Sequence, residues 1–321
     1  TEIKEGLYFT FPTNRKMASF RLKLEKAFPN EGVDILKNVP GFFKRKSDGL
    51  WSFTYHKGIG IGIKNAKGQV VGIQIRHDEK NSEKQSRYVW FSSSFASLDK
   101  ENFEYGTSSG SPVDVVYPEK ITNAYVYITE GRFKAQLLAK KMGSVVLSVQ
   151  GVCSWRGIAN ELENLVNSNV LYERLTENLK GKPFKVKSLL VAFDADLNYK
   201  VQVFEQLRKM TDALESIDDF KYPVYYLNWN EELGKGIDDV FINQNEKGIR
   251  RYDKQKWDKH YQLMIEDILK KEPYENIKKV PAEIVKKYFY QHFTDFPPLT
   301  NGALSEKHKR HYLKMRKQHV C

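Results

Sequence analysis

The first informative feature of the sequence is the distribution of its apolar runs. Four such runs lie between Ala124 and Phe241, separated by segments with helical periodicity: YVYIT, SVVLSV, SLLVAF and YPVYYL. Short continuous apolar runs are typical of strands buried on both faces, and helical connections between them favour parallel pairing. This region therefore predicts a β-α-β-α-β-α-β fold, a parallel sheet flanked by helices of the α/β class.

The pattern is different between Trp51 and Ser94, where apolar and polar residues alternate. The segments WSFTYH, GIGIGIKN and QVVGIQIRHD have a period of two, and a turn at residues 65–68 separates the last two. Because successive side chains point to opposite faces of a strand, this pattern predicts a β-hairpin. RYVWFSSS predicts a third strand after a polar loop at residues 78–86, and the Gly/Ser-rich residues 106–112 predict a linker.

Both ends of the chain have helical character. The stretch from Met17 to Ala27 is helix-like, residues 255–271 and 282–293 have the periodicity of amphipathic helices, and the C-terminal stretch KHKRHYLKMRKQHVC is strongly basic. We therefore expect an α+β chain overall, in four parts. These parts are an α-rich entry segment (1–50), a β-rich subdomain (51–120), the parallel-sheet domain (121–245) and a helical basic C-terminal segment (246–321).

The charge balance adds an expectation about partners. The 321 residues include 52 Lys and Arg against 40 Asp and Glu, a formal net charge of +12. This balance favours a polyanionic partner such as nucleic acid, although a solvated lysine-rich surface gives the same sum. No apolar run approaches the ~20 residues that span a bilayer, so we expect a cytoplasmic protein without membrane contact. The start at Thr1, without a methionine, predicts a trimmed N-terminus.

Acidic residues follow the ends of the predicted strands. Glu130 comes directly after YVYIT, and Asp194 and Asp196 come after SLLVAF. The pair Asp238–Asp239 comes after YPVYYL. The carboxyl ends of parallel strands meet at one sheet edge, where clustered carboxylates repel one another unless a cation such as Mg²⁺ or Mn²⁺ lies between them. The alternative is that Asp194 and Asp196 are helix N-caps and that Asp238–Asp239 begin another helix. It accounts for any one site alone, but poorly for all three at strand ends.

These motifs, in this order, resemble the Toprim domain of primases, topoisomerases and related nucleases. ITEGRFKA, AFDADLN and KGIDD look most like the primase-like proteins of phages, plasmids and other mobile elements. GIGIGIKNAKGQVVGIQIR and RYVWFSSS are similar to the β-rich subdomain that precedes Toprim in bacterial primases. The resemblance extends over about residues 41–242, and it implies a Toprim-type parallel sheet behind a β-rich subdomain.

The resemblance also implies roles for individual residues. Glu130 takes the place of the Toprim glutamate, a general acid/base or metal ligand, and Asp194 and Asp196 take the place of the metal-binding pair. Asp238, with Asp239 beside it, matches a later acidic position that also binds metal. For Arg76 and Arg87 the resemblance implies contacts to nucleotide phosphates and template, and we also expect Lys134 and Lys235 to bind nucleotide or nucleic acid. Lys134 lies one helical turn beyond Glu130, and the alternative for it is a solvated helix surface.

Two departures from the bacterial primases affect the expectations. Those primases often have a glycine soon after the Asp-x-Asp, whereas this chain has Leu197, Asn198 and Tyr199, so we expect a different local turn. They also have an N-terminal zinc module, which the two cysteines of this chain, Cys153 and Cys321, cannot build. Template choice must then come from elsewhere, or priming is not the activity.

The function that the resemblance implies is metal-dependent nucleotidyl transfer, with Mg²⁺ or Mn²⁺ as cofactor. The reaction would be primer synthesis from nucleoside triphosphates on single-stranded DNA. Two alternatives stay open: a Toprim nuclease, which would use water at the same site, and a non-catalytic replication accessory that binds single-stranded nucleic acid. Because no Gly-x-x-x-x-Gly-Lys-Ser/Thr motif is present, we expect a replicative helicase or another replication protein as partner.

Overall fold

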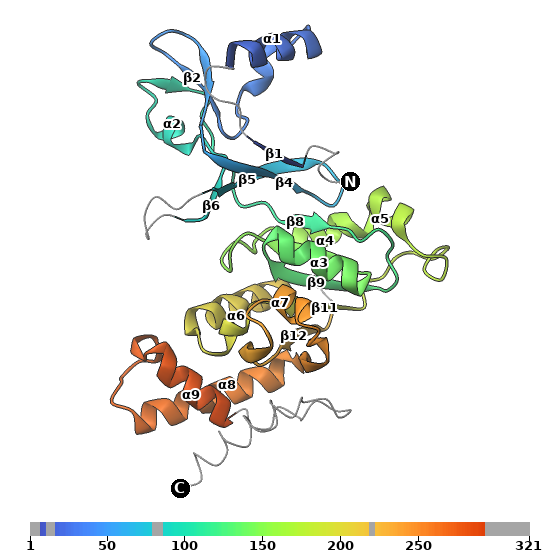
Figure 1. Cartoon of the computed structure of the whole chain (residues 1–321), viewed down its shortest axis with the longest axis vertical. Coiled ribbons are helices and arrows are strands. Elements are labelled where there is room, and N and C mark those ends of the chain that lie inside the picture. The colour runs from blue at the N-terminus through green and yellow to red at the C-terminus, as the bar shows by residue number, and fades with distance from the viewer. Residues whose placement is uncertain (1–6, 11–16, 79–85, 218–221, 293–321) are drawn as a thin grey trace. The chain divides into compact units, whose positions relative to one another are not determined.

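The chain is organised as two compact units, Thr1–Asp114 and Val115–Cys321. The computed structural model describes residues 7–10, 17–78, 86–217 and 222–292. In Figure 1 the first unit runs from blue to teal and the second from green to red. The finer division into four parts stays a prediction.

The first unit contains the predicted β-hairpin. Strands β4 (Gly58–Lys64) and β5 (Val70–His77) pair antiparallel. Asn65 closes the turn between them, because its side-chain oxygen accepts hydrogen bonds from the backbone amides two and four residues later, each 3.0 Å long. The predicted third strand is present as β6 (Tyr88–Trp90), antiparallel to β5. The alternation of apolar and polar residues was therefore a reliable guide in this region.

The first 50 residues contain both helices and strands. Helix α1 (Met17–Ala27) has the predicted bounds, and the 3₁₀-helix η2 (Gly32–Leu36) follows it. The sequence did not predict β1 (Tyr8–Thr10), which pairs with β4, or β2 (Phe42–Arg45). A second, three-stranded sheet has the order β3-β2-β7. Its other strands and the adjoining helix are β3 (Trp51–Phe53), β7 (Phe103–Glu104) and α2 (Ser94–Leu98).

An aromatic core holds the first unit together. The ring of Phe42 stacks on Phe20 with centroids 5.7 Å apart and meets Phe91 edge-on at 5.4 Å. Offset and edge-to-face contacts of this kind add to the free energy gained by burying the rings. The buried residues of this cluster are Leu36, Trp51, Phe53, Ile75 and Phe91.

The second unit contains the predicted parallel sheet. The four apolar runs form β9 (Tyr125–Glu130), β10 (Val145–Val149), β11 (Ser188–Ala192) and β12 (Val224–Asn228). Strand β9 pairs in parallel with β10 and β11, and β11 pairs in parallel with β12. Two strands that the sequence did not predict complete a six-stranded sheet of order β13-β12-β11-β9-β10-β8. They are β8 (Asp114–Val116) and β13 (Arg250–Asp253), which is antiparallel to β12.

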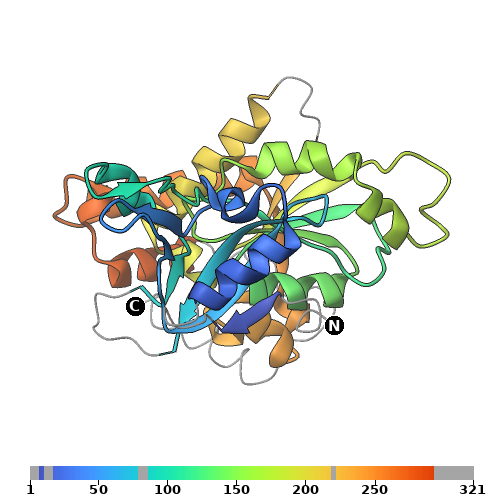
Figure 2. The same ribbon diagram turned by 90° about the horizontal axis from the view of Figure 1, so that it is seen from above.

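Helices cover both faces of this sheet (Figure 2). The helices that lie between its strands or follow β12 are α3 (Arg132–Met142), α4 (Ile158–Val166), α5 (Asn169–Arg174), α6 (Val201–Glu215) and α7 (Ile237–Ile242). Helices α3 and α7 share an apolar cluster with Tyr225 on one face. Tyr226, the next residue, points to the other face, where its hydroxyl lies 3.0 Å from Thr211 Oγ1 of α6.

Two glycines in left-handed conformations define the ends of α3. Gly131, with φ of 85°, lets the chain turn from β9 directly into the helix, and Gly143, with φ of 60°, ends it. Side chains are strained at such angles, so both positions favour glycine. Glu130 is therefore held at the junction of a buried strand and a helix.

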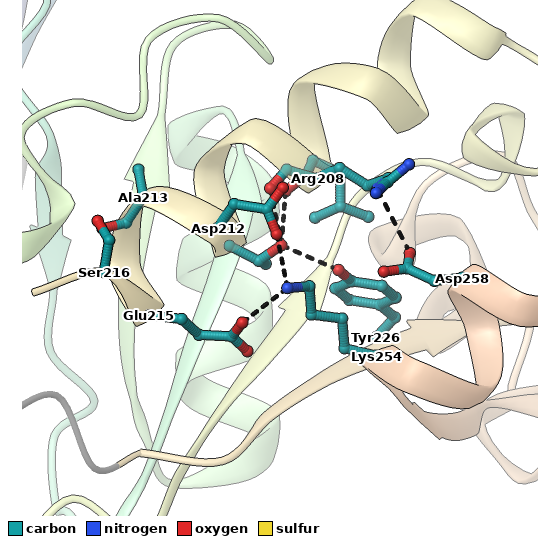
Figure 3. Close-up of polar contacts among 10 residues, drawn as sticks. Arg208, Asp212, Ala213, Glu215, Ser216, Tyr226, Lys254 and Asp258 are labelled. Carbon is teal, nitrogen blue, oxygen red and sulfur yellow. Dashed lines mark hydrogen bonds and ion pairs between the residues drawn. The ribbon is translucent and has the colours of Figure 1, made fainter.

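Two further helices, α8 (Lys254–Lys271) and α9 (Ala282–His292), follow the sheet as predicted. Figure 3 shows how α8 is attached to α6: the ammonium group of Lys254 donates to Asp212 and Glu215, each at 2.6 Å. Trp257 and Tyr261 of α8 are buried. The strongly basic C-terminal stretch lies outside the described residues. No helix within the described ranges is long and apolar enough to cross a membrane.

Candidate functional site

The candidate site lies where the two central parallel strands of the second unit end. Glu130 is the last residue of β9, and its register partner on β10 is Val149. Strand β11 ends two residues before Asp194, and Thr129 of β9 is in register with Ala192 of β11. Both carboxylates therefore emerge from neighbouring strands at the same sheet edge, which is the place that their sequence positions predicted.

A third segment, the turn before α7, comes to the same edge. The backbone amide of Ala195 donates to the carbonyl of Lys235 at 2.8 Å, so this turn is held beside the end of β11. Gly236 follows in the turn. A Cβ atom added to Gly236 would lie 2.3 Å from Asp238 Oδ1, 3.0 Å from Lys134 Cε and 3.4 Å from Asp194 Oδ1. Lys134, Asp194 and Asp238, which are distant from one another in the sequence, thus surround one glycine. Because Gly236 has no side chain, the three can lie close together.

Lys134 is the central positive charge of this group. Its ammonium group forms a hydrogen-bonded ion pair with Asp194 Oδ1, and both side chains are largely buried, with 22% and 15% exposed. Burial by itself lowers the pKa of Lys134, but the charge of Asp194 and the hydrogen bond to it raise the pKa overall, with smaller contributions from Glu130 and Asp238. The structure thus places Lys134 inside the carboxylate cluster, in place of the solvated helix surface that was the alternative.

Two carboxyl groups of the cluster are unusually easy to protonate. Burial raises the pKa of Glu130 above its usual value, and the carboxylate of Asp194 raises it further, whereas Lys134 opposes the shift. Burial likewise raises the pKa of Asp238, again against the effect of Lys134. Asp238 Oδ1 is buried and has no hydrogen-bond partner within the described residues. An unpaired buried acceptor is costly, and it marks a place where a cation or a donor would be stabilised.

The other two predicted acidic residues have defined contacts. Asp196, in the 3₁₀-helix η3 (Ala195–Asn198), is 8% exposed and accepts a 2.6 Å hydrogen bond from Lys200. Asp239 accepts from the backbone amide of Gly236 at 3.0 Å, as a residue in the first turn of α7. Asp194, by contrast, makes no side-chain cap hydrogen bond to η3. The helix-cap interpretation therefore describes Asp239 but not Asp194.

The turn after Asp194 is held by a residue whose role the sequence did not reveal. Asn198 is fully buried, its side chain donates to the carbonyl of Trp229 at 3.3 Å, and its Oδ1 accepts from Asn228 at the end of β12. These bonds tie η3, which carries Asp196, to the neighbouring strand. The only feature of the sequence that pointed to Asn198 was the absence of the glycine that bacterial primases often have soon after the Asp-x-Asp. Gly236 was notable in the sequence only as part of the KGIDD motif.

The predicted basic residues fall in different places. Lys235 is exposed, and its charge lowers the pKa of Glu130 slightly. Arg76 and Arg87 belong to the first unit, where Arg76 of β5 is opposite Tyr88 and the carbonyl of Arg87 accepts from the amide of His77 at 3.0 Å. The structure thus gathers Glu130, Lys134, Asp194 and Asp238 at one sheet edge. In the first unit, separately, Arg76 lies on β5 and Arg87 directly precedes β6.

The donor set of the cluster is compatible with a hard divalent cation. Among the described residues, no group of three or more His, Cys, Asp or Glu side chains is arranged to hold a metal ion. Two of the carboxylates are instead paired with lysines, Asp194 with Lys134 and Asp196 with Lys200. The ligand atoms nevertheless fit the group, because they are all carboxylate oxygens, the ligands that Mg²⁺ and Mn²⁺ prefer, and Asp238 Oδ1 is an unsatisfied one.

Comparisons with known proteins give one family match and several similar structures. Residues 119–248, inside the second unit, match the family described as "Domain of unknown function (DUF3854)". No curated protein matches the chain. A similar solved structure is the RNA polymerase domain of the Mycobacterium tuberculosis primase DnaG, at 10% identity, with 99% of this chain and 87% of that chain covered and a TM-score of 0.47.

Two other similar structures are also primase domains. The zinc-binding and RNA polymerase domains of the Aquifex aeolicus primase match at 12% identity over 97% of this chain, with a TM-score of 0.43. This chain covers 61% of the Aquifex chain, which is less than two thirds. A DNA primase domain from Pseudomonas aeruginosa matches at 10% identity, with 81% of this chain and 80% of that chain covered and a TM-score of 0.41.

Proposed function

We propose that this chain is a primase-like replication enzyme that joins nucleoside triphosphates on single-stranded DNA by metal-dependent nucleotidyl transfer. The observation that carries the proposal is the convergence of Glu130, Asp194 and Asp238 at the carboxyl edge of one parallel sheet. The order of the three motifs around these residues, which resembles the Toprim order, supports it as well. Charged side chains gathered at such an edge are typical of ligand sites in α/β proteins.

Each residue of the cluster has a chemical role in this proposal. Asp194, Asp196, Asp238 and Asp239, with Glu130, are the candidate ligands of Mg²⁺ or Mn²⁺. When bound, the cation would neutralise charge on the phosphoryl group being transferred. Glu130, whose carboxyl is buried and has a raised pKa, would accept the proton of the 3′-hydroxyl as that oxygen bonds to the α-phosphorus and pyrophosphate leaves. A base with a pKa closer to neutrality is better suited to that transfer.

The basic residues would bind the substrate in this proposal. Lys134 and Lys235 lie at the acidic edge and would contact phosphate oxygens. Arg76 and Arg87 would bind the triphosphate or the template, since guanidinium groups bind phosphates with two parallel hydrogen bonds. Single-stranded DNA, nucleoside triphosphates and a replicative helicase are the proposed partners, and a phage, plasmid or other mobile element is the proposed origin.

A second candidate function, a non-catalytic accessory that binds single-stranded nucleic acid, has one observation in its favour. Lysines neutralise the two aspartates that would hold the metal, Asp194 through Lys134 and Asp196 through Lys200. A cluster balanced in this way is stable without a cation. A nuclease would use the same acidic residues, with water in place of the 3′-hydroxyl.

One assay separates the three candidates. The protein is incubated with single-stranded DNA, labelled nucleoside triphosphates and Mg²⁺ or Mn²⁺, with and without a partner helicase, and the products are resolved by length. Products that incorporate label support the proposed function, and fragments shorter than the input DNA support the nuclease. Absence of both, with DNA binding intact, would leave the accessory function.

A further inference from the structure

The position of Lys134 has a consequence for the way the acidic site acquires a metal ion. We infer that Lys134 is a built-in competitor of the divalent cation: its ammonium group occupies Asp194, and it must leave Asp194 before the cation can bind there. This inference rests on the proposed function, because it takes the site to be one that binds a divalent cation.

The contacts of Lys134 place its charge among the candidate ligands. Its ammonium group is ion-paired with Asp194 Oδ1, and its Cε atom is close enough to Gly236 that an added Cβ there would lie 3.0 Å away. That same added atom would lie 2.3 Å from the unpartnered Asp238 Oδ1. The end of the Lys134 side chain is thus beside both aspartates, where a cation shared by them would have to be.

An ammonium group and a divalent cation cannot both bind the same carboxylate oxygen at this position. They carry charges of the same sign, and within a largely buried site their repulsion is screened less than in water. Lys134 belongs to α3, which starts directly after Glu130 and Gly131, so its backbone is fixed relative to the site. Its four-carbon side chain, however, can adopt other rotamers at little cost. Exchange of the side chain is therefore feasible without movement of the helix.

The exchange would couple metal binding to substrate binding. Once Lys134 leaves Asp194, its ammonium group needs another anionic oxygen, and a substrate phosphate entering the site supplies one. Lys134 would then change from the counter-ion of the acidic residues to a ligand of the substrate. In the absence of substrate, the same residue would keep the affinity of the site for a divalent cation low.

Three substitutions distinguish direct competition from general electrostatics. Lys134→Met removes the ion pair, Lys134→Arg keeps a positive charge at Asp194, and Lys235→Met removes one exposed charge near Glu130 without removing a hydrogen bond or ion pair seen among the described residues. The full chain is stripped of metal and titrated with Mn²⁺ alone by calorimetry. The thermal midpoint of each variant is measured with and without Mn²⁺, to separate metal affinity from folding.

We expect Lys134→Met to bind Mn²⁺ about tenfold or more tightly than the wild type, the factor that corresponds to removing one charge-assisted hydrogen bond. Lys235→Met should tighten binding by no more than about fivefold, because exposed charges contribute little, and Lys134→Arg should bind weakly, as the wild type does. The Mn²⁺-induced rise in thermal midpoint should be largest for Lys134→Met, even if its metal-free form is less stable.

Two results would overturn the inference without contradicting the proposed function. In the first, the wild type binds Mn²⁺ and Lys134→Met binds it equally or more weakly. In the second, Lys235→Met increases the affinity for Mn²⁺ as much as Lys134→Met does, which would mean that net charge alone controls this affinity. Absence of Mn²⁺ binding in the wild type and in every variant would overturn the inference and the proposed function together. If the wild type synthesises DNA-templated products with metal and Lys134→Met binds Mn²⁺ no more tightly than the wild type, the inference is wrong and the proposed function still holds.

Discussion

The hydroxyl of Thr129 in β9 donates a 2.7 Å hydrogen bond to the carbonyl of Ala192 in β11. Thr129 is fully buried, and each of the two residues lies one or two positions before a carboxylate of the site, Glu130 or Asp194. The side-chain bond thus ties together the ends of the two strands that position these carboxylates. A buried hydrogen bond at this place supports the geometry of the site as well as the stability of the sheet.

Replacing Thr129 with Val keeps the shape of the side chain and removes this hydrogen bond. We expect the free energy of unfolding to fall by about 1 kcal/mol, the usual net value for one hydrogen bond, and Mn²⁺ affinity to fall with it. Urea unfolding and calorimetry measure the two effects. Ser216→Ala, which removes an exposed hydroxyl that bonds to Ala213, is the control and should change neither quantity appreciably. A Thr129→Val variant with wild-type stability would show that the bond is dispensable.

Gly236→Ala tests the convergence of the site directly. The backbone of Gly236 has φ of −98°, so alanine is not strained there, but its methyl group would collide with Asp238 Oδ1 and crowd Lys134. We expect Mn²⁺ affinity to fall at least about tenfold. The control is Gly248→Ala, whose methyl group would meet only the side chain of Leu233. It should cost stability through overpacking and leave metal affinity unchanged. Equal effects of the two variants on metal affinity would argue against a site at Gly236.

Glu130→Gln keeps the size of the side chain and removes its charge and its capacity to exchange a proton. If Glu130 is the general base, turnover should fall on the order of 10²-fold or more, while binding of single-stranded DNA hardly changes. Product formation and fluorescence anisotropy measure the two quantities. Loss of DNA binding together with activity would instead indicate that Glu130 is a structural residue.

The ion-pair network in Figure 3 predicts a dependence of stability on pH. Burial raises the pKa of Asp258 above its usual value, against the opposing charges of Arg208 and Lys254. A carboxyl whose pKa is raised on folding contributes stability at low pH, and this contribution is lost as the pH rises through the folded-state pKa. Asp258→Asn should therefore gain stability relative to the wild type as the pH rises from about 3 to about 7. Urea unfolding across this range measures the difference.

Asp267→Asn is the matched control for that experiment. A hydrogen bond from Lys271 lowers the pKa of Asp267, and His292 contributes to the shift. Its contribution to stability is therefore present above the usual carboxyl pKa and is lost as the pH falls through the lowered value. Asp267→Asn should lose stability relative to the wild type over the same rise in pH. Identical pH profiles of the two variants would contradict the assigned shifts.

The net charge of +12 predicts binding of single-stranded DNA that weakens steeply with salt, because binding releases counter-ions from the phosphates. Fluorescence anisotropy at a series of salt concentrations measures the slope. Removal of residues 302–321, which contain the basic run from Lys307 to Lys317, should weaken DNA binding more than catalysis. Binding that does not depend on salt would remove the nucleic-acid interpretation.

Local patterns in the sequence were sufficient for much of the fold and for part of the site. The four apolar runs became β9 to β12, the alternating segment became the hairpin of β4 and β5, and Glu130 and Asp194 lie at strand ends as expected. These features depend on short-range properties: hydrophobic periodicity, turn residues such as Asn65, and the direct passage from strand to helix at Gly131. None of them needs knowledge of which strands are neighbours.

Other features were decided by the tertiary structure, because they depend on which distant segments meet. The pairing of Lys134 with Asp194 requires β9 and β11 to be adjacent, and the role of Gly236 requires the turn before α7 to pack at their ends. Asn198 holds the turn after Asp194 through hydrogen bonds with Trp229 and Asn228, which lie next to it only in the folded chain. Strand β13 was missed because its residues, RRYD, are mostly polar and join the sheet edge through backbone pairing with β12. Periodicity in the sequence encodes burial and local conformation, whereas contacts between remote side chains arise only when the whole sheet has formed.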